Sequence, residues 1–354
     1  MKTFRTILVI SILNINIFTL HTYAEEPSLF SDKYIYSTLT ETQQQLYQIL
    51  YTNILNQQTT ISLAEYEFTR DDLYTTYYAL DYENPGIFWT MGGYNYRFKT
   101  KSDKITSVSP VYSRDLIEPS LVYSQVDNCI KSLMTHINST EDQLQQVKLI
   151  HDYLVTTVTY SNTGDNIERD IDGALIFKRA QCEGYSKAFA YLCQKINIPC
   201  ICVHGLYKEG SHMWNMIKLE DTWYHVDVTF DDLAVNDIAY DYFCLSDDQI
   251  QQDHTFQNPY TQPKATQSTN PYHLVGKTQY TSLDEAYNGL ILDMVANYQK
   301  GHKVTQIYCS PEIMRPLCSE IKAKIYSSLA PYNIPRVKIL YRFKGSILYT
   351  TFDV

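Results

Sequence analysis

Three residue types in the central part of the chain could form a thiol active site. Cys182 lies in "RAQCEGYSKAFAYL", and His212 and Asp227 lie in "HMWNMIKLEDTWYHVDVTF". A cysteine nucleophile must be held as a thiolate, and it needs a base for its proton and a group that orients the base. The resulting chemistry is acyl transfer. The thiolate attacks an amide carbonyl, the imidazole protonates the leaving amine, and water or another amine resolves the thioester.

The spacing after Cys182 predicts a helix over 182–196. Tyr185, Phe189, Leu192 and Ile196 recur at intervals of four, three and four residues, which places them on one helical face. Cys182 would lie in the first turn, where unpaired N–H groups and the helix dipole favour a thiolate. A lone helical cysteine is more often a buried core residue, so its position alone does not predict an enzyme.

A hairpin downstream could supply the base and its orienting group. A tight turn at 220–221 would place Trp214 opposite Asp227 and His212 opposite Thr229. His212 and Asp227 would then share one face as diagonal neighbours, about 7–8 Å apart at Cα. The carboxylate could fix the tautomer of the imidazole and stabilise its cationic form.

Other histidines and other roles compete with this interpretation. His225 lies on the same predicted face and is a rival base, and His204 lies on a neighbouring strand. His151 lies in a helix with a packing pattern. His212 could be an edge-strand residue, and Asp227 could cap the turn before "FDD". The combination of the three residues, and none of them alone, favours a functional site.

The eight cysteines do not form the framework of a small disulfide-rich domain. Cys200 and Cys202 lie in the apolar run "IPCICVHG", which predicts core packing over a redox or zinc site. If Cys182 is a free thiol, the other seven could form at most three bridges.

The first residues predict an export signal. Lys2 and Arg5 precede an apolar stretch over 6–20, and "TYA" places cleavage after Ala24. The apolar stretch is shorter than the roughly 20 residues of a membrane span, so we expect a secreted or cell-envelope protein with no stable membrane anchor. The net charge of −10 argues against a nucleic-acid partner.

The rest of the chain predicts an α+β protein in several parts. We expect a signal peptide over 1–24, an N-terminal α+β region over 25–138, the catalytic core over 139–254, a linker over 255–272 and a C-terminal α/β module over 273–354. Helices are expected at 119–137 and 140–157, and the C-terminal module should end in a hairpin that turns at Lys344-Gly345.

Three segments together resemble the core of the transglutaminase-like superfamily of bacterial secreted proteins. They are "QCEGYSKAFAYLCQKINIPC", "HMWNMIKLEDTWYHVDVTFDD" and "YFCLSDDQI", and the resemblance covers roughly 139–254. It implies a papain-like core, in which a helix bearing the cysteine packs on an antiparallel sheet bearing the histidine and aspartate. It also implies that Cys182 is the nucleophile, His212 the base and Asp227 the orienting group. Phe230 stands where tryptophan is frequent in the family.

The remaining site residues are expectations around this triad. The Cys182 N–H is one candidate oxyanion donor, and Gln181 or Tyr160 could supply the second. Trp214, Tyr185 and Asn215 are candidates for the substrate cleft. We expect no cofactor and no metal, and the chain has no calcium-loop motif of the D-x-D-x-D-G type.

The predicted substrate is a protein, a peptide or a cell-wall peptide. Hydrolysis is favoured over cross-linking, but the same triad serves both reactions. The alternatives are a protein-glutamine γ-glutamyltransferase that cross-links glutamine to lysine, and a non-catalytic adhesion or scaffold module that retains the fold.

Overall fold

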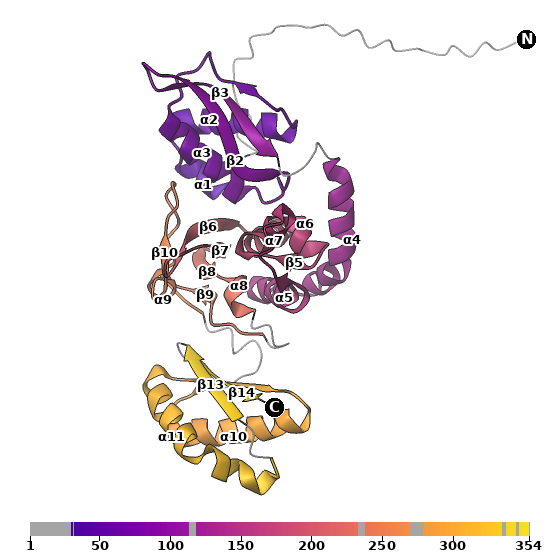
Figure 1. Cartoon of the computed structure of the whole chain (residues 1–354), viewed down its shortest axis with the longest axis vertical. Helices are drawn as coiled ribbons and strands as arrows, with labels where there is room; N and C mark the ends of the chain where they lie inside the picture. Colours follow the sequence, from indigo (N-terminus) through magenta and orange to yellow (C-terminus); the bar gives the residue numbers. More distant parts are fainter. Residues whose placement is uncertain are drawn as a thin grey trace, which may run out of the picture. The chain divides into compact units, whose positions relative to one another are not determined.

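The computed structural model describes residues 30, 32–112, 118–232, 238–269, 279–334, 338–344 and 347–353. The predicted signal peptide, 1–24, lies outside these residues. The chain from Lys33 to Val354 clusters as one compact unit, and Figure 1 shows its elements in chain order.

The N-terminal region combines helices with a three-stranded sheet of order β1-β3-β2. Its elements are α1 (Tyr34–Thr38), α2 (Glu41–Leu55), β1 (Ile61–Ser62), α3 (Arg70–Glu83), β2 (Thr90–Lys99) and β3 (Lys104–Tyr112). Thr40 and Thr69 begin α2 and α3 with capping boxes, in which side chains satisfy the first N–H groups. Strands β2 and β3 form an antiparallel hairpin, and β1 is limited to Ile61–Ser62.

The central part is an α+β papain-like core. Helices and short elements come first: α4 (Pro119–Ile137), α5 (Gln143–Thr157), β4 (Thr159–Tyr160), η1 (Asn166–Arg169), α6 (Ile171–Leu175), β5 (Arg179–Ala180) and α7 (Cys182–Lys195). The sheet elements follow: β6 (Cys200–Tyr207), β7 (Gly210–Leu219), β8 (Thr222–Val226), α8 (Val228–Asp231), β9 (Phe243–Leu245), α9 (Asp247–Ile250) and β10 (His254–Phe256). The five strands form an antiparallel sheet of order β10-β6-β7-β8-β9.

Helix α7 packs on this sheet through the apolar face that its sequence predicts. Tyr185, Phe189 and Leu192 are fully buried, and α7 contacts both β6 and β7. Burying such side chains stabilises the fold by about 1.5–3 kcal/mol each. The predicted helix of the cysteine and the predicted helices α4 and α5 are confirmed.

The hairpin of β7 and β8 has the predicted register over most of its length. Leu219 lies opposite Thr222 and Asn215 lies opposite Val226, around a turn in which Glu220 takes the left-handed conformation. The prediction that His212 lies opposite Thr229 is wrong, because β8 ends at Val226 and the chain enters α8.

The segment after β10 contacts the core, although its composition predicts a linker from residue 255. Strand β10 pairs with β6, and the Tyr260 hydroxyl donates to the Cys202 carbonyl at 2.6 Å. Ala265 is buried, and its carbonyl accepts from the Asp247 N–H at 2.7 Å. A few apolar side chains therefore hold a polar segment on the sheet.

The C-terminal module has its own sheet, of order β11-β12-β14-β13, and two long helices. Its elements are β11 (Gln279–Tyr280), α10 (Leu283–Gln299), β12 (Val304–Cys309), α11 (Pro311–Leu329), η3 (Ala330–Tyr332), β13 (Lys338–Lys344) and β14 (Ile347–Asp353). The predicted hairpin is confirmed, but the predicted position of its turn is wrong, because Lys344 belongs to β13 and lies opposite Ile347. Among the described residues, the helices are all too short or too polar to cross a bilayer.

Candidate active site

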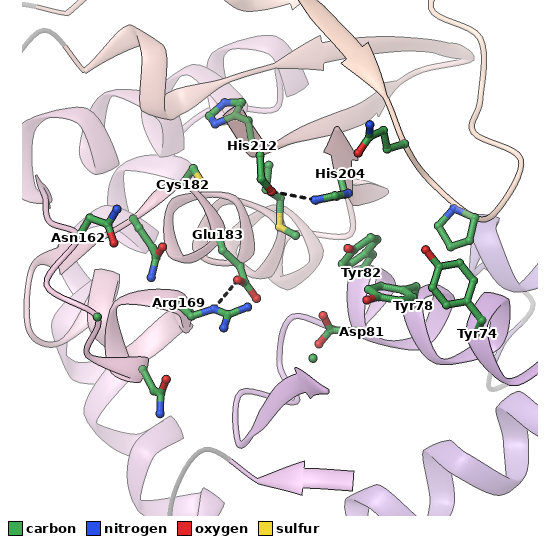
Figure 2. Close-up of a pocket in the computed structure, with 18 residues that line it drawn as sticks. Tyr74, Tyr78, Asp81, Tyr82, Asn162, Arg169, Cys182, Glu183, His204 and His212 are labelled. Carbon is green, nitrogen blue, oxygen red and sulfur yellow. Dashed lines mark hydrogen bonds and ion pairs between the residues drawn. The ribbon is translucent and has the colours of Figure 1, made fainter. Parts of the chain in front are cut away.

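Cys182 is the first residue of α7 and lines a cavity of about 760 Å³. Figure 2 shows its sulfur beside His212 at the cavity wall. The thiol is partly exposed, and Gln181 precedes it as the N-cap in an extended conformation. The helix N-terminus therefore presents a reachable cysteine next to an imidazole, an arrangement that favours a thiolate.

Gly184 permits the close approach that positions this first turn. A Cβ at residue 184 would lie 2.3 Å from the Glu168 carbonyl oxygen and 2.9 Å from the Ala180 Cβ. The backbone of η1 thus occupies the space that any side chain would need. This contact gives a steric reason for glycine in the Cys-x-Gly sequence.

Gly184→Ala is expected to lower the free energy of unfolding by about 1–3 kcal/mol, because the added methyl overpacks a backbone contact. Thermal and urea unfolding measure the loss. Gly86→Ala is the matched control, since its nearest neighbours would be 3.8 Å away. An equal effect of the two substitutions would contradict the steric account.

His212 and Asp227 meet in the buried interior beside the thiol. The His212 Nε2 donates to the Asp227 Oδ2 at 2.6 Å, and the two residues are 6% and 0% exposed. Because Nε2 bonds to Asp227, Nδ1 is the ring nitrogen of His212 that remains available to the Cys182 thiol. Burial by itself lowers the pKa of His212, but Asp227 and Cys182 outweigh it and raise the pKa to about 10. The imidazole of His212 is therefore protonated at neutral pH.

Asp227 is fixed by the start of α8 and by a second histidine. It is the N-cap of this helix, where its Oδ1 accepts from the Phe230 N–H at 3.3 Å. Its Oδ2 accepts from the His254 Nε2 at 3.2 Å. Burial raises the pKa of Asp227, but the two histidines outweigh it and hold the pKa well below its usual value.

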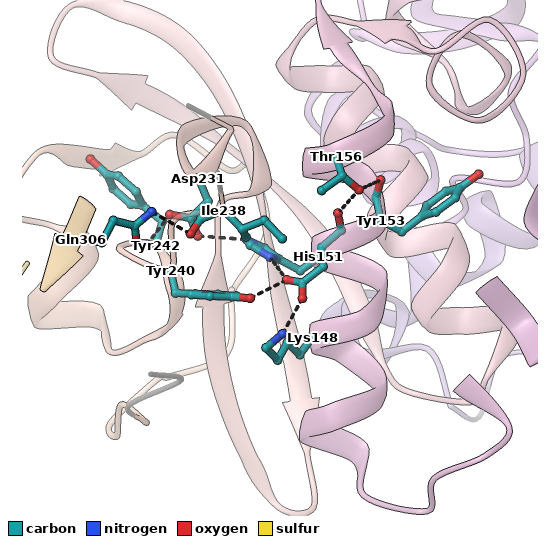
Figure 3. Close-up of polar contacts among 10 residues, drawn as sticks. Lys148, His151, Tyr153, Thr156, Asp231, Ile238, Tyr240, Tyr242 and Gln306 are labelled. Atoms are coloured by element: carbon teal, nitrogen blue, oxygen red, sulfur yellow. Dashed lines mark hydrogen bonds and ion pairs between the residues drawn. The ribbon is translucent and has the colours of Figure 1, made fainter. Parts of the chain in front are cut away.

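Helix α8 is in turn anchored to α5 by a buried histidine (Figure 3). The His151 ring contacts Asp231 through Nε2 and Asp152 through Nδ1, each at 3.1 Å. Burial lowers the pKa of His151, but the hydrogen bonds to both carboxylates outweigh it and raise the pKa. The contact between His151 and Asp231 therefore links α8, whose N-cap is Asp227, to α5. The predicted packing role of His151 agrees with this burial.

His151→Ala is expected to destabilise the fold by about 3–5 kcal/mol, because it removes the imidazole that pairs with the buried Asp231 carboxylate. His151 has a raised pKa in the folded state. Its contribution is therefore fully present below the unfolded value of about 6.5 and is lost as the pH rises through the folded value. Urea unfolding at several pH values measures this trend, with the exposed His136→Gln as control. If the loss of unfolding free energy in His151→Ala grew between pH 6 and 9, this prediction would be contradicted.

The two oxyanion candidates lie next to the thiol. Gln181 lines the cavity beside Cys182. Tyr160 is 51% exposed in β4, and its pKa is raised by burial and by the charge of Cys182. Both positions are compatible with the predicted role, which stays a prediction.

The three cleft candidates lie in the core, away from the cavity wall. The Tyr185 hydroxyl donates to Asp232 at 2.6 Å, and the Asn215 amide donates to the Ser186 carbonyl at 2.9 Å. Trp214 is fully buried and stacks on His212 with ring centroids 6.0 Å apart. None of the three lines the cavity that contains Cys182, so they are core residues around the site.

The rival histidines have other partners. His225 is buried, accepts from the Trp214 Nε1 at 3.1 Å and contacts Asp247 at 2.9 Å. His204 lines the cavity and contacts the Ser211 hydroxyl at 3.1 Å. Among the described histidines with a shifted pKa, His212 is the one whose pKa is raised by Cys182.

An ionic cluster at the wall of the same cavity was missed by sequence reasoning. The Lys187 Nζ lies 2.9 Å from Glu183, 3.5 Å from Asp81 and 3.7 Å from Asp170. The Arg169 Nε donates to Glu183 at 2.7 Å. Glu183 and Lys187 are four residues apart in a predicted helix, which is a detectable signal. Asp81 lies in α3, far from Lys187 in the sequence, so no local spacing predicts the contact between them.

Side chains of metal-ligand type also gather here. Within the described ranges, His212, Asp227 and His254 form a group whose ligand atoms lie within 4.8 Å of one another. The same atoms take part in the two hydrogen bonds to Asp227. A metal would have to replace both bonds, so the arrangement fits a hydrogen-bonded triad better than a cation site.

The comparisons with known proteins identify the class of this domain. Residues 131–228 match the family model of the transglutaminase-like superfamily. The central domain therefore carries the sequence pattern of this superfamily over these residues. No curated protein matches the chain.

Similar solved structures cover parts of the chain. One is a crystal structure of a TGase, with 12% identity, a TM-score of 0.31 and coverage of 46% of this chain. Another is a putative cysteine protease from Cytophaga hutchinsonii, with 14% identity, a TM-score of 0.27 and coverage of 39% of this chain and 61% of that one. A third is the periplasmic domain of TgpA from Pseudomonas aeruginosa, with 14% identity, a TM-score of 0.23 and coverage of 36% of this chain and 57% of that one. The chain spans 48% of the TGase.

Proposed function

We propose that the protein is a thiol enzyme that transfers acyl groups at amide bonds, with water as its usual acceptor. Cys182 is the nucleophile, His212 the general base and acid, and Asp227 the orienting group. The observation that carries this proposal is the buried His212–Asp227 hydrogen bond beside the Cys182 thiol, at the wall of a cavity.

The three residues share the two half-reactions. The thiolate attacks the carbonyl, and the imidazolium gives its proton to the departing amine as the thioester forms. The neutral imidazole then takes a proton from water, which attacks the thioester and releases the acid. Asp227 stabilises the imidazolium in each half of the cycle.

The cavity supports a polypeptide substrate. Tyr74, Tyr78 and Tyr82 line it at intervals of four residues along α3, which corresponds to about 12 Å of helix. Neighbouring rings are 5.0 and 5.5 Å apart, and Asn162 lies across the cavity from them (Figure 2). A polar aromatic wall of this length suits several residues of an extended protein, peptide or cell-wall peptide.

Incubation of the full chain with casein and a fluorescent primary amine tests the proposal. We expect new amino termini in casein with little label incorporated, and we expect Cys182→Ala to produce neither. Label incorporation that is lost in Cys182→Ala would favour the cross-linking alternative. If neither product forms with casein or with cell-wall peptides while the fold is intact, the non-catalytic alternative is supported.

We also propose that the protein is exported to the cell envelope or the medium. The basic and apolar segments before Ala24 support this proposal. N-terminal sequencing of the protein from culture medium and envelope fractions is expected to begin at Glu25. A mature protein that begins at Met1 would contradict cleavage.

A further inference from the structure

Asp227 is shared by two imidazoles, and the mechanism described so far uses one of them. Its Oδ2 accepts from the His212 Nε2 at 2.6 Å and from the His254 Nε2 at 3.2 Å. His254 begins β10, next to β6 on the edge of the sheet, and is 0% exposed. The second histidine therefore approaches the site from a different strand.

The partners of His254 determine its protonation state. Its Nδ1 lies 2.7 Å from the Asp253 Oδ1, while its Nε2 faces Asp227. Carboxylates accept hydrogen bonds, and a neutral imidazole can donate from one nitrogen only. Both bonds together require the doubly protonated ring. Burial lowers the pKa of His254, but the bonds to Asp227 and Asp253 outweigh it and raise the pKa.

We propose that His254 is a positioning residue, a buried imidazolium that holds Asp227 toward His212 and shares its charge. The inference rests on the proposed function of the same site. His254 touches no substrate and acts through Asp227. The series of contacts runs from Asp253 through His254, Asp227 and His212 to Cys182.

The titratable groups around His254 come from several elements. The carboxylates are Asp253 and Asp227, and the histidines are His212 and His225 of β8. The tyrosines are Tyr207 of β6 and Tyr242, whose ring centroids lie 5.4 and 5.5 Å from that of His254. Trp214 and Phe230 cover the remaining faces at 4.9 and 5.6 Å. The two carboxylates are thus the groups that compensate the charge of His254 in this interior.

The charge of His254 has a predictable sign of effect on His212. Two cations share one carboxylate, so a positive His254 makes protonation of His212 less favourable. If residue 254 loses its charge but still donates a hydrogen bond to Asp227, the negative charge of Asp227 stabilises the His212 cation alone. The imidazole of His212 should then hold its proton to a higher pH.

His254→Gln is the informative variant, because its amide can still donate to Asp227 but carries no charge. The readout is the rate of Cys182 carboxymethylation by iodoacetate between pH 4 and 11, followed by mass spectrometry. Iodoacetate is an anion and reacts best with a thiolate beside a protonated imidazole. We therefore expect the rate of carboxymethylation of the chain without substitutions to follow a bell-shaped curve against pH. In His254→Gln, the basic limb of this curve should move to higher pH. Asp253→Asn should move it in the same direction.

His254→Ala also removes the hydrogen-bond donor to Asp227. Because this bond helps to hold Asp227 in place, we expect carboxymethylation to slow by roughly ten- to a hundred-fold at pH 7. His225→Gln is the control, because His225 is equally buried but has no contact with Asp227. Near-UV circular dichroism checks that each variant is folded.

The outcomes separate this inference from the proposed function. A bell-shaped profile in the unmodified chain whose basic limb is unmoved, or moved to lower pH, in folded His254→Gln overturns the inference alone. A parallel loss of rate at every pH shows a merely structural role and also overturns it. If the unmodified chain gives no selective reaction at Cys182, the proposed function itself fails.

Discussion

Cys182→Ala is expected to reduce amide hydrolysis by about 10⁴-fold or more, because the residue that forms the covalent intermediate is absent. The substitution removes a partly exposed sulfur at a helix start, so the fold should be retained. The measurement is the release of new amino termini from casein, together with thermal unfolding of each variant.

Cys129→Ala is the matched control for this loss. Cys129 is an exposed free thiol on α4, and its substitution should leave activity within two-fold, as is usual for exposed sites away from the chemistry. Residual hydrolysis by Cys182→Ala above a tenth of the original rate would show that another group performs the reaction.

Asp227→Asn is expected to lower the rate by roughly 10³- to 10⁴-fold while the fold persists. The amide removes the charge that stabilises the His212 imidazolium and favours the wrong tautomer of the ring. Asparagine is as good an N-cap as aspartate, so α8 should still begin at Val228. Rates with casein and the unfolding midpoint separate the chemical effect from the structural one.

Asp221→Asn provides the comparison for this charge loss. Asp221 lies in the exposed turn of the same hairpin and pairs with Lys218, so its substitution should leave both activity and stability almost unchanged. A loss of less than ten-fold in Asp227→Asn would mean that His212 does not depend on this carboxylate.

Local patterns were sufficient to predict the thiol helix and the hairpin register. The apolar face of α7 has helical spacing, and a two-residue turn sets the pairing of Leu219 with Thr222. Both signals are contained within about twenty residues. The same arithmetic failed beyond Val226, because Asp227 leaves the strand to cap α8 and to bond with the Tyr242 carbonyl.

The contacts that complete the site are long-range, and the sequence contains no local signal for them. His254 reaches Asp227 from the other edge of the sheet, and Asp81 reaches Lys187 from the N-terminal region. Strand parity predicted that Trp214 lies on the same face as His212, but it did not predict how deeply Trp214 is buried. A residue on the correct face can still be covered by neighbouring elements, as the burial of Trp214 shows.

The most direct test of the central claim is brief treatment of the full chain with iodoacetamide at pH 6, followed by mass spectrometry of each cysteine. All eight cysteines are free thiols, so each reports on its own surroundings. Cys182 is expected to be labelled at least about ten-fold faster than the exposed Cys129 or the partly buried Cys318, and His212→Gln should remove this preference. If Cys182 reacts no faster than Cys129, the activated thiolate does not exist and the account is contradicted.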